Sequence, residues 1–440
     1  MQATKAPWQQ LIGLSVCLTL CTLLLLGLAS CATNPPNTNT DAGPLHLTLW
    51  HGINPPANRD VFNDLVAEFN RRHADIDIEA LYIGQPDGQL PKILTAIVGD
   101  VPPDLLWFVP QLTGQLVELD AIRPIDDWLA QSPHRQDLDP ALLETMSLGE
   151  HLWSVPFATN NAAIFYRPSL FAAAGIDRLP ATWDELQDTA RRLTADLDGD
   201  GRSDRYGMFL SVGKGEWTVF VWLPFLFGAG GELVTPDGQP NLSNPGAIAA
   251  LSLGTALVQS GWATLSAPER GFELDEFLAG RAAMQVTGPW TLGQLQQTDI
   301  DYGVFPFPAR NQHQSPAAVV GGENLFVMKT TPERERAAWE FCEYVLSEEF
   351  QTAWALGTGY LPANLSSRQS NRYQEFVEQN PVLKVFLEQM NVARSRPIVP
   401  GYARLSENFG RAIESALLSR DTPTEALAAS QRRLDLAFSR

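Results

Sequence analysis

Hydrophobic and polar residues follow two different periods along the chain, and together they predict a mixed α/β protein. Residues 45–50 (LHLTLW) are rich in β-formers, and residues 60–73 carry apolar side chains at helical spacing. Residues 76–83 (IDIEALYI) return to a strand pattern. A strand, a helix and a strand in this order favour a βαβ unit with a parallel sheet.

The same succession continues beyond this unit. Residues 90–100 predict a helix and residues 102–109 another strand, and a second α/β region begins near residue 154. The last third is mainly helical, in residues 332–356, 372–390 and 409–419. We find no internal repeat, and the length of 440 residues favours two domains.

The first 44 residues have a pattern of their own. A short polar leader with Lys5 precedes an apolar run from Leu11 to Leu28, which is the layout of a secretory signal, although the run is also long enough for an uncleaved membrane anchor. Leu28 to Cys31 (LASC) resemble the lipobox of bacterial lipoproteins. We therefore predict a signal peptide over 1–30, a diacylglyceryl lipid on Cys31, and a flexible tether over 31–44, because its Asn, Pro, Thr and Gly residues form no hydrophobic face.

Composition narrows the class of protein. The chain is 45% hydrophobic and 18% charged, as expected for a soluble body, and its formal net charge of −19 makes polyanionic nucleic acid an unsuitable partner. Once the leader is removed and Cys31 is lipidated, Cys342 is the one remaining thiol. It lies in a helical apolar pattern, which favours a buried inert thiol over a nucleophile.

Several segments together resemble the family 1 extracellular solute-binding proteins, the substrate receptors of sugar-type ABC importers. The segments are LTLWHG, ILTAIVGDVPPDLLWF, VPFATNNAAIFYRPSLFAAAGI, FLAGRAAMQVTGPW, GGENLFV and TGYLPAN, in this order along the chain. The resemblance implies the periplasmic-binding type II fold, with two α/β lobes joined by hinge crossings. Lobe 1 is expected over residues 45–155 and 306–357, and lobe 2 over 158–303 and 363–440.

The resemblance also implies a function without catalysis. A ligand binds between the lobes, the lobes close, and a two-subunit permease with a cytoplasmic ATPase receives the ligand. The protein is then exported, held at the cell membrane by its lipid anchor on the periplasmic or outer side, and monomeric, and it requires no cofactor. The sequence contains no GxxxxGK motif, which is the phosphate-binding loop of many ATPases, and this agrees with an ATPase on another chain.

A sugar offers weakly apolar faces and a rim of hydroxyls, so its site needs aromatic planes and polar side chains. The resemblance places such residues at eleven positions in seven motifs, which include GKGEW and GYARL, together with Gly321. The eleven are Trp50, His51, Asn160, Asn161, Trp217, Trp290, Gly322, Glu323, Asn324, Tyr360 and Arg404. Alternative structural roles stay open for three of them: a core position for Trp50, a satisfied buried histidine for His51, and a solvated helix-end charge for Arg404.

The expected ligand is a neutral sugar, a disaccharide or a glycosylated polyol. The alternative is glycerol-3-phosphate or a glycerophosphodiester, because TGYLP, the GG pair and RPIVPGYARL resemble the glycerol-3-phosphate-binding branch. In that branch an arginine near the chain's end, matched here by Arg404, reaches the phosphate, whereas GPW is typical of branches that bind neutral sugars. A lipoprotein glycosidase with two carboxylates and a sensory scaffold are alternatives from other classes.

The segment DLDGDGRSDRYG resembles the opening of a calcium loop. Its ligands would be Asp196, Asp198, Asp200, the Arg202 carbonyl and Asp204. The twelfth position, where a bidentate glutamate is needed, is Gly207. A plain Asp/Gly turn is therefore the alternative to a structural calcium site.

Overall fold

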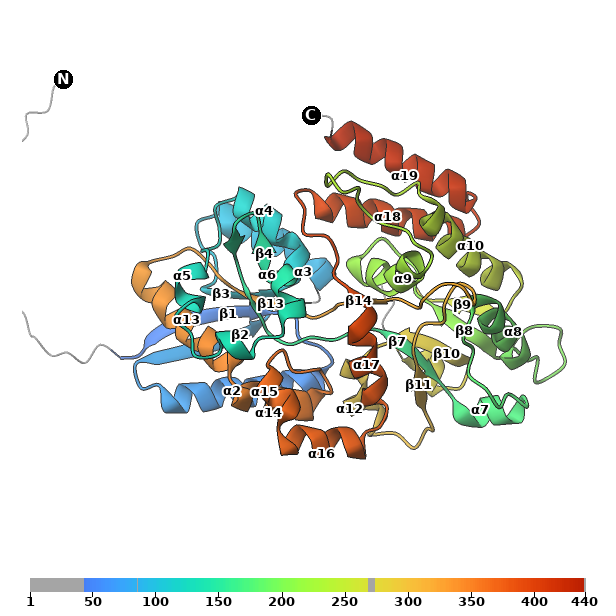
Figure 1. The fold of residues 1–440 in the computed structure, drawn as a ribbon, viewed down its shortest axis with the longest axis horizontal. Helices are drawn as coiled ribbons and strands as arrows, with labels where there is room; N and C mark the ends of the chain where they lie inside the picture. Colours follow the sequence, from blue (N-terminus) through green and yellow to red (C-terminus); the bar gives the residue numbers. More distant parts are fainter. Residues whose placement is uncertain (1–42, 85, 268–273, 439–440) are drawn as a thin grey trace, which may run out of the picture. The chain divides into compact units, whose positions relative to one another are not determined.

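The computed structural model describes residues 43–84, 86–267 and 274–438, and residues 45 onward form one compact unit. Within this unit two five-stranded sheets each carry helices on both faces (Figure 1). The predicted signal peptide, Cys31 and the tether up to residue 42 lie outside the described residues. Over the described ranges, none of the helices combines the length and the apolar character needed to cross a bilayer.

The first sheet has the strand order β2-β1-β3-β13-β6. Its strands are β1 (Leu45–His51), β2 (Ile76–Tyr82), β3 (Leu105–Phe108), β6 (Val155–Pro156) and β13 (Asn324–Val327). The first three are parallel, as the βαβ pattern predicts, and β13 is antiparallel to both of its neighbours. The late segment β13 therefore completes a sheet that the beginning of the chain starts.

Helices cover both faces of this first sheet. They are α2 (Pro56–Arg72), α3 (Pro86–Val98), η2 (Pro110–Leu112), α4 (Thr113–Glu118), α5 (Asp126–Leu129), η3 (Arg135–Asp137), η4 (Pro140–Leu142), α6 (Leu143–Met146), α13 (Pro332–Leu346) and α14 (Glu348–Thr358), with a hairpin of β4 (Ser147–Leu148) and β5 (His151–Leu152). Helix α2 buries Phe62, Leu65, Val66 and Phe69 along one stripe. This stripe packs with α13 and α14 on one core cluster.

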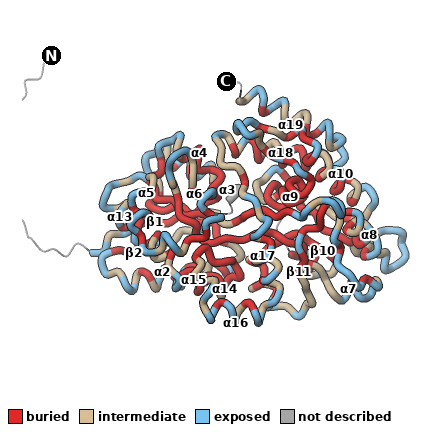
Figure 2. Tube along the Cα trace, in the orientation of Figure 1, coloured by how far each residue is buried: buried red, intermediate tan, exposed pale blue. Residues whose placement is uncertain are grey.

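The second sheet has the order β11-β7-β10-β8-β9. Its strands are β7 (Ala163–Tyr166), β8 (Tyr206–Leu210), β9 (Ala263–Leu265), β10 (Ala282–Thr287) and β11 (Gly303–Phe305), and its helices are α7 (Pro168–Ala173), α8 (Trp183–Leu193), α9 (Glu216–Gly228), α10 (Pro245–Gln259), α11 (Asp275–Leu278), η5 (Pro289–Thr291) and α12 (Leu292–Leu295). Every residue of β10 is buried, since both faces of this strand are covered. Figure 2 shows the buried residues running through both sheets.

Helix α9 is the central helix of this second lobe. It is apolar all round, and eleven of its residues from Thr218 to Gly228 are buried. A helix without a polar face belongs in a core rather than on a surface. Its first residues, Glu216 and Trp217, stay only partly buried because they lie at the end of the helix that faces the first lobe.

The C-terminal helices complete the unit. They are α15 (Leu365–Gln369), α16 (Asn371–Gln379), α17 (Leu383–Gln389), η6 (Met390–Val392), α18 (Tyr402–Leu417) and α19 (Pro423–Phe438). Helices α18 and α19 pack on α9 and α10, and their buried residues join the core of the second lobe. Helices α16 and α17 cover the other face of the second sheet, where Tyr373 and Phe386 contact its core cluster.

Several chain segments cross between the lobes side by side. Thr159 pairs with Leu361, and Asn160 pairs with Gly321, so three crossings are tied by backbone hydrogen bonds. Strand β12 (Ala318–Val319) also pairs in parallel with β14 (Ala393–Arg394). Hydrogen-bonded crossings of this kind let the lobes move as bodies about a common hinge region.

Two of the predicted lobe boundaries differ from the packing. Residues 306–320 remain with the second lobe, because Phe307 and Val319 enter its core and Ala309 exchanges backbone hydrogen bonds with residues 181 and 183. Helix α15, predicted in lobe 2, packs on lobe 1. There Arg368 forms an ion pair with Asp139 (2.6 Å).

Cys342 is fully buried in α13, and burial raises the pKa of its thiol above the usual range. We expect Cys342 to stay unmodified by iodoacetamide in the folded protein and to react completely after denaturation in guanidinium chloride, because only the thiolate reacts. Peptide mass spectrometry measures alkylation of Cys342 separately from alkylation of the other cysteines. Rapid alkylation of Cys342 in the folded protein would contradict a buried inert thiol.

Candidate functional site

A cavity lies between the two lobes at the crossings, and we call it the inner cavity. It has a volume of about 170 Å³ and is lined by Gly52, Asn54, Pro55, Trp107, Val109, Asn160, Glu216, Trp217, Phe220, Trp290, Thr291, Gln294, Gly321, Gly322, Glu323, Tyr360 and Arg396. Beside it the lobes contact one another, since Asn58 Nδ2 of α2 donates to the Trp290 carbonyl of η5 (3.5 Å). Both lobes and the crossings therefore contribute to one site.

Four aromatic side chains form a continuous wall of the inner cavity. The Trp290 ring lies 5.7 Å from Trp217, 6.3 Å from Phe220 and 6.3 Å from Tyr360, between ring centroids. Gly288 allows this arrangement, because a Cβ at that position would lie 2.1 Å from the Trp290 ring. Aromatic faces of this kind suit the C–H faces of a sugar or a cation.

A hydrogen-bonded ion pair forms the polar side of the cavity. Arg396 Nη1 donates to Glu216 Oε1 (2.6 Å), and the Tyr402 hydroxyl donates to the same oxygen (2.8 Å). The Ser406 hydroxyl donates to the second oxygen of Glu216. Arg396 is only 4% exposed, and its guanidinium also lies over the Phe220 ring. The two charges therefore compensate one another inside the protein.

Glu323 is the second carboxyl group of the inner cavity. Its backbone carbonyl accepts from the Phe157 N–H (3.1 Å), and the preceding Gly322 has φ +111°, a conformation that favours glycine. Among the described residues no side chain donates a hydrogen bond to the Glu323 carboxyl group. Burial raises the pKa of Glu323 to about 7, and the nearby Arg396 only partly opposes this shift.

Of the predicted site residues, six line this cavity together with Gly321. They are Asn160, Trp217, Trp290, Gly322, Glu323 and Tyr360, which come from the crossings, α9 and η5. These residues are up to 200 positions apart in the sequence, and the pairing of the crossings brings them together. Burial raises the pKa of the Tyr360 hydroxyl well above its usual range, and Glu323 adds to this shift.

Trp50 and His51 lie outside the cavity lining. His51 follows Leu47 and Leu49 on the same face of β1, so the two-residue period directs its ring into the core. The ring contacts Phe62 at 5.1 Å between centroids, and burial lowers the pKa of His51 to about 4, with the Arg59 charge adding to the effect. Trp50 points to the other face and packs on the cluster that contains Leu106.

Asn161 and Asn324 are also held in structural contacts instead of the cavity. Asn161 Nδ2 donates to the Phe386 carbonyl (2.8 Å) and its Oδ1 accepts from Gln389 (2.8 Å), which fixes the first crossing to α17. Asn324 Nδ2 donates to the Thr145 carbonyl (3.0 Å) and to Ser154 Oγ (2.8 Å). Both amides are buried, and these bonds satisfy their polar groups within the protein.

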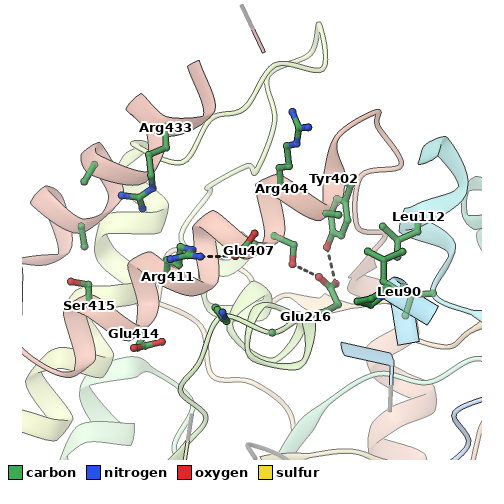
Figure 3. Close-up of a pocket in the computed structure, with 18 of the residues that line it drawn as sticks. Leu90, Leu112, Glu216, Tyr402, Arg404, Glu407, Arg411, Glu414, Ser415 and Arg433 are labelled. Atoms are coloured by element: carbon green, nitrogen blue, oxygen red, sulfur yellow. Dashed lines mark hydrogen bonds and ion pairs between the residues drawn. The ribbon is translucent and has the colours of Figure 1, made fainter. Parts of the chain in front are cut away.

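Arg404 lines a second, outer cavity of about 1100 Å³ (Figure 3). This cavity runs along α18 and shares Glu216 and Val109 with the inner cavity. Arg404 is exposed, and its side chain extends away from Glu216 in Figure 3. The predicted contact of Arg404 with a ligand in the inner cavity therefore has no support from this arrangement.

Sequence reasoning missed several residues of the inner cavity. The principal ones are Trp107, Glu216, Phe220, Gln294 and Arg396. Glu216 directly precedes the predicted Trp217, and Phe220 lies one helical turn further on, so the neighbourhood of residues three and four apart on a helix offered a signal for both. Arg396 lies in the RPIVPGYARL segment, where only Arg404 was singled out. No sequence signal identifies its partner, which lies 180 residues away.

The Asp-rich loop lies apart from both cavities. Asp196, Asp198 and Asp204 are exposed, and one carboxylate oxygen of each lies within 4.8 Å of the others. The carboxylates accept hydrogen bonds from backbone amides of the same loop; Asp196, for example, accepts from Gly199 (2.7 Å) and Gly201 (2.8 Å). These bonds lower the pKa of Asp196 and also fit a self-capped turn.

The raised pKa of Glu323 predicts that the stability of the folded protein depends on pH. Its pKa is about 7 in the folded protein, whereas a glutamate in the unfolded chain has its ordinary value of about 4.5, so between these pH values the folded state binds the extra proton and the free energy of unfolding falls as pH rises. We expect Glu323→Gln to be more stable than the wild type at pH 8 by about 2–3 kcal/mol and nearly equal at pH 5. Urea unfolding at both pH values measures this difference.

The control for this prediction is Glu118→Gln, a substitution at an exposed residue of α4. It removes one carboxyl group without touching the cavity, so its effect on stability is expected within about 0.5 kcal/mol at either pH. An equal difference between Glu323→Gln and the wild type at pH 5 and pH 8 would show that the Glu323 carboxyl does not titrate as described.

Comparisons with known proteins identify the family. Residues 56–352 match the model of the bacterial extracellular solute-binding protein family, and the chain belongs to this family. The maltotriose-binding protein of Pyrococcus abyssi is 24% identical over 330 residues, which are 73% of this chain and 67% of that protein. The family and the α/β fold of the periplasmic-binding type II, both predicted from the sequence, are thereby confirmed.

Two solved structures illustrate the similarity. The cyclic α-maltosyl-1,6-maltose binding protein from Arthrobacter globiformis is 27% identical, with a TM-score of 0.74 over 90% of this chain and 99% of that chain. UgpB from Mycobacterium tuberculosis, in complex with glycerophosphocholine, is 20% identical, with a TM-score of 0.79 over the same shares. The second likeness concerns the fold alone.

Proposed function

We propose that this protein is the carbohydrate-binding component of an ABC importer. The observation that carries the proposal is the inner cavity, in which the aromatic wall of Trp217, Phe220, Trp290 and Tyr360 lies together with polar groups. Trp107 Nε1 and Arg396 Nε are buried donors without a hydrogen-bond partner among the described residues. A polyhydroxyl ligand supplies oxygen acceptors for such donors and C–H faces for the rings.

The charges of the inner cavity favour a carbohydrate over a glycerol phosphate. Among its described lining residues Arg396 is the one cation, and Glu216 already neutralises it. Glu323 adds a further carboxyl group. A phosphate needs several charge-assisted donors, and a neighbouring carboxylate repels it.

Binding acts through closure of the two lobes. Trp290 belongs to lobe 2 and its carbonyl accepts from Asn58 of lobe 1, while Tyr360 and Glu323 lie on crossings. A ligand that contacts all of these groups stabilises the closed arrangement, and a permease then recognises that arrangement. We expect no chemical change of the ligand, and a sugar recovered intact after prolonged incubation would support a receptor over a glycosidase.

A thermal-shift screen tests the proposed function. The panel contains neutral mono- and disaccharides, glycosylglycerols, glycerol phosphates and glycerophosphodiesters. A ligand at 100 times its dissociation constant stabilises the folded state by about 2.7 kcal/mol, which a melting curve resolves. A shift with carbohydrates supports the proposal, and a shift confined to phosphate compounds overturns it in favour of the glycerol-phosphate alternative.

We further propose export with a lipid anchor on Cys31, so that the monomeric binding protein stays close to a two-subunit permease and its ATPase. The family match supports an extracellular location. Two acyl chains on one cysteine give a stable anchor without a retained helix. Metabolic labelling with palmitate tests the anchor: wild-type protein should take up label, and Cys31→Ser should not.

We also propose structural calcium at Asp196, Asp198 and Asp204, with Asp200 and the Arg202 carbonyl as further candidates. The closeness of three carboxylates supports it, and the missing glutamate at position 207 weakens it. Calcium is expected to raise the melting temperature of the wild type but not of Asp198→Asn. If calorimetry shows no heat on addition of calcium, and chelation causes no loss of stability, the loop is a plain Asp/Gly turn without a calcium site.

A further inference from the structure

The inner cavity contains one more carboxyl group than its ion pair needs. Glu216 and Arg396 neutralise each other, and the hydroxyls of Tyr402 and Ser406 occupy both carboxylate oxygens of Glu216. Glu323 remains, and no side-chain donor among the described residues reaches its carboxyl group. The inner cavity therefore holds a surplus carboxyl group, which gives it a net negative charge whenever Glu323 is ionised.

The surroundings of Glu323 are aromatic. The rings of Trp217, Trp290 and Tyr360 line the same cavity, and Arg396 already places its guanidinium over the fourth ring, that of Phe220, at 5.0 Å from the centroid. The electron-rich faces of such rings attract cations, and they do so more strongly where water is excluded. A neutral ligand leaves Glu323 either charged and buried or protonated, and both states cost free energy.

We propose that the ligand of this site is a carbohydrate that carries a positively charged amino group, which Glu323 and the aromatic wall bind together. This inference rests on the proposed function and narrows its ligand class. An ammonium group donates to the carboxylate as a charge-assisted hydrogen bond and lies against the ring faces. The raised pKa of Glu323 agrees, because burial disfavours the carboxylate and the nearby Arg396 only partly compensates for it.

Titration calorimetry of the full-length protein tests the inference at pH 7. The ligands are matched sets in which amino groups replace the C2 hydroxyl groups: glucose with glucosamine, galactose with galactosamine, and cellobiose with the chitosan disaccharide, with N-acetylglucosamine as a neutral control of larger size. We expect the amino compound of at least one set to bind about tenfold more tightly than its parent and than its N-acetyl form.

The variant Glu323→Gln tests whether the Glu323 carboxylate causes the preference for the amino compound. It keeps the size of the side chain and removes the charge, so the tenfold preference should fall to about one while the parent sugar still binds. Glu407→Gln in α18, which lines the outer cavity alone, is the matched control and should keep the preference. Its carboxylate pairs with Arg411 instead of facing the aromatic wall.

Failure of this inference can be distinguished from failure of the proposed carbohydrate-binding function. Equal or tighter binding of neutral sugars by the wild type overturns the inference and leaves the carbohydrate function in place. A preference for the amino compound that persists in Glu323→Gln also overturns it. Binding of glycerophosphocholine, a second source of an ammonium group, without binding of any carbohydrate would keep the ammonium site and overturn the carbohydrate function.

Discussion

Replacing Arg396 with alanine is expected to lower the free energy of unfolding by about 3–5 kcal/mol, because the Glu216 carboxylate, whose side chain is only 17% exposed, then loses its cation. Arg396 is 4% exposed and pairs with Glu216 at 2.6 Å. Urea unfolding at pH 7, followed by far-UV circular dichroism, measures the change. The double variant Glu216→Gln with Arg396→Met should recover most of the loss, since it removes both charges.

Arg394 offers a matched control two positions earlier in the same segment. Its guanidinium pairs with Glu232 at 2.5 Å, but 42% of the Arg394 side chain and 48% of the Glu232 side chain are exposed. Arg394→Ala is therefore expected to cost below about 1 kcal/mol. Equal losses for Arg394→Ala and Arg396→Ala would contradict the assignment of a buried, uncompensated charge to Glu216.

The second large effect concerns binding. Trp290→Ala is expected to weaken the affinity for carbohydrate by about 100-fold or more, because a buried aromatic anchor near the centre of a site contributes about 2–4 kcal/mol. Trp290 contacts three other rings of the inner cavity and packs against the cores of both lobes. Its loss therefore removes ring contacts and loosens the closed arrangement. Titration calorimetry with the ligand found in the thermal-shift screen measures the affinity.

Trp262→Ala controls for the loss of a large aromatic side chain. Trp262 is a partly buried tryptophan of lobe 2 that packs against the same core cluster as Trp290 but does not line the inner cavity. This variant should lose stability and keep its affinity within about threefold. Retained affinity in Trp290→Ala, at a comparable loss of stability, would show that the aromatic wall is part of the core and not of a binding site.

The position of the inner cavity explains how this fold can act as a receptor when only the hinge region changes its conformation. Its lining comes from the end of α9, from η5 and from crossings that pair with each other at Asn160 and Gly321. A ligand bound there contacts both lobes and the segments that join them. In the proposed mechanism, ligand binding and lobe closure are one equilibrium, and the population of the closed form reports the ligand to a partner.

The local period of the sequence determined the elements of the first sheet. Strand, helix and strand over residues 45–82 follow from alternation and helical spacing, because these patterns place apolar side chains on one face. The same alternation determines the direction of the His51 side chain, which lies on the buried face of β1 with Leu47 and Leu49. A stricter use of the two-residue period would have placed His51 in the core from the sequence alone.

The motifs that resemble the family indicated most of the predicted aromatic and glycine positions of the cavity, including Trp217, Trp290 and Tyr360. Two of the asparagines in these motifs, Asn161 and Asn324, bind backbone carbonyls instead. A motif fixes where a residue lies along the chain. It does not fix the direction of a side chain, which depends on the neighbours that satisfy its polar groups.

The sequence by itself thus determined the α/β elements, the family and the segments that build the site. Only the tertiary structure decided the charge balance of that site, because Glu216 at the start of α9 and Arg396 in the segment before α18 are 180 residues apart and meet through tertiary packing. It also decided that Glu323 lacks such a partner. Local patterns record which face of a strand or helix is buried, whereas the pairing of distant charges depends on how the lobes and crossings pack together.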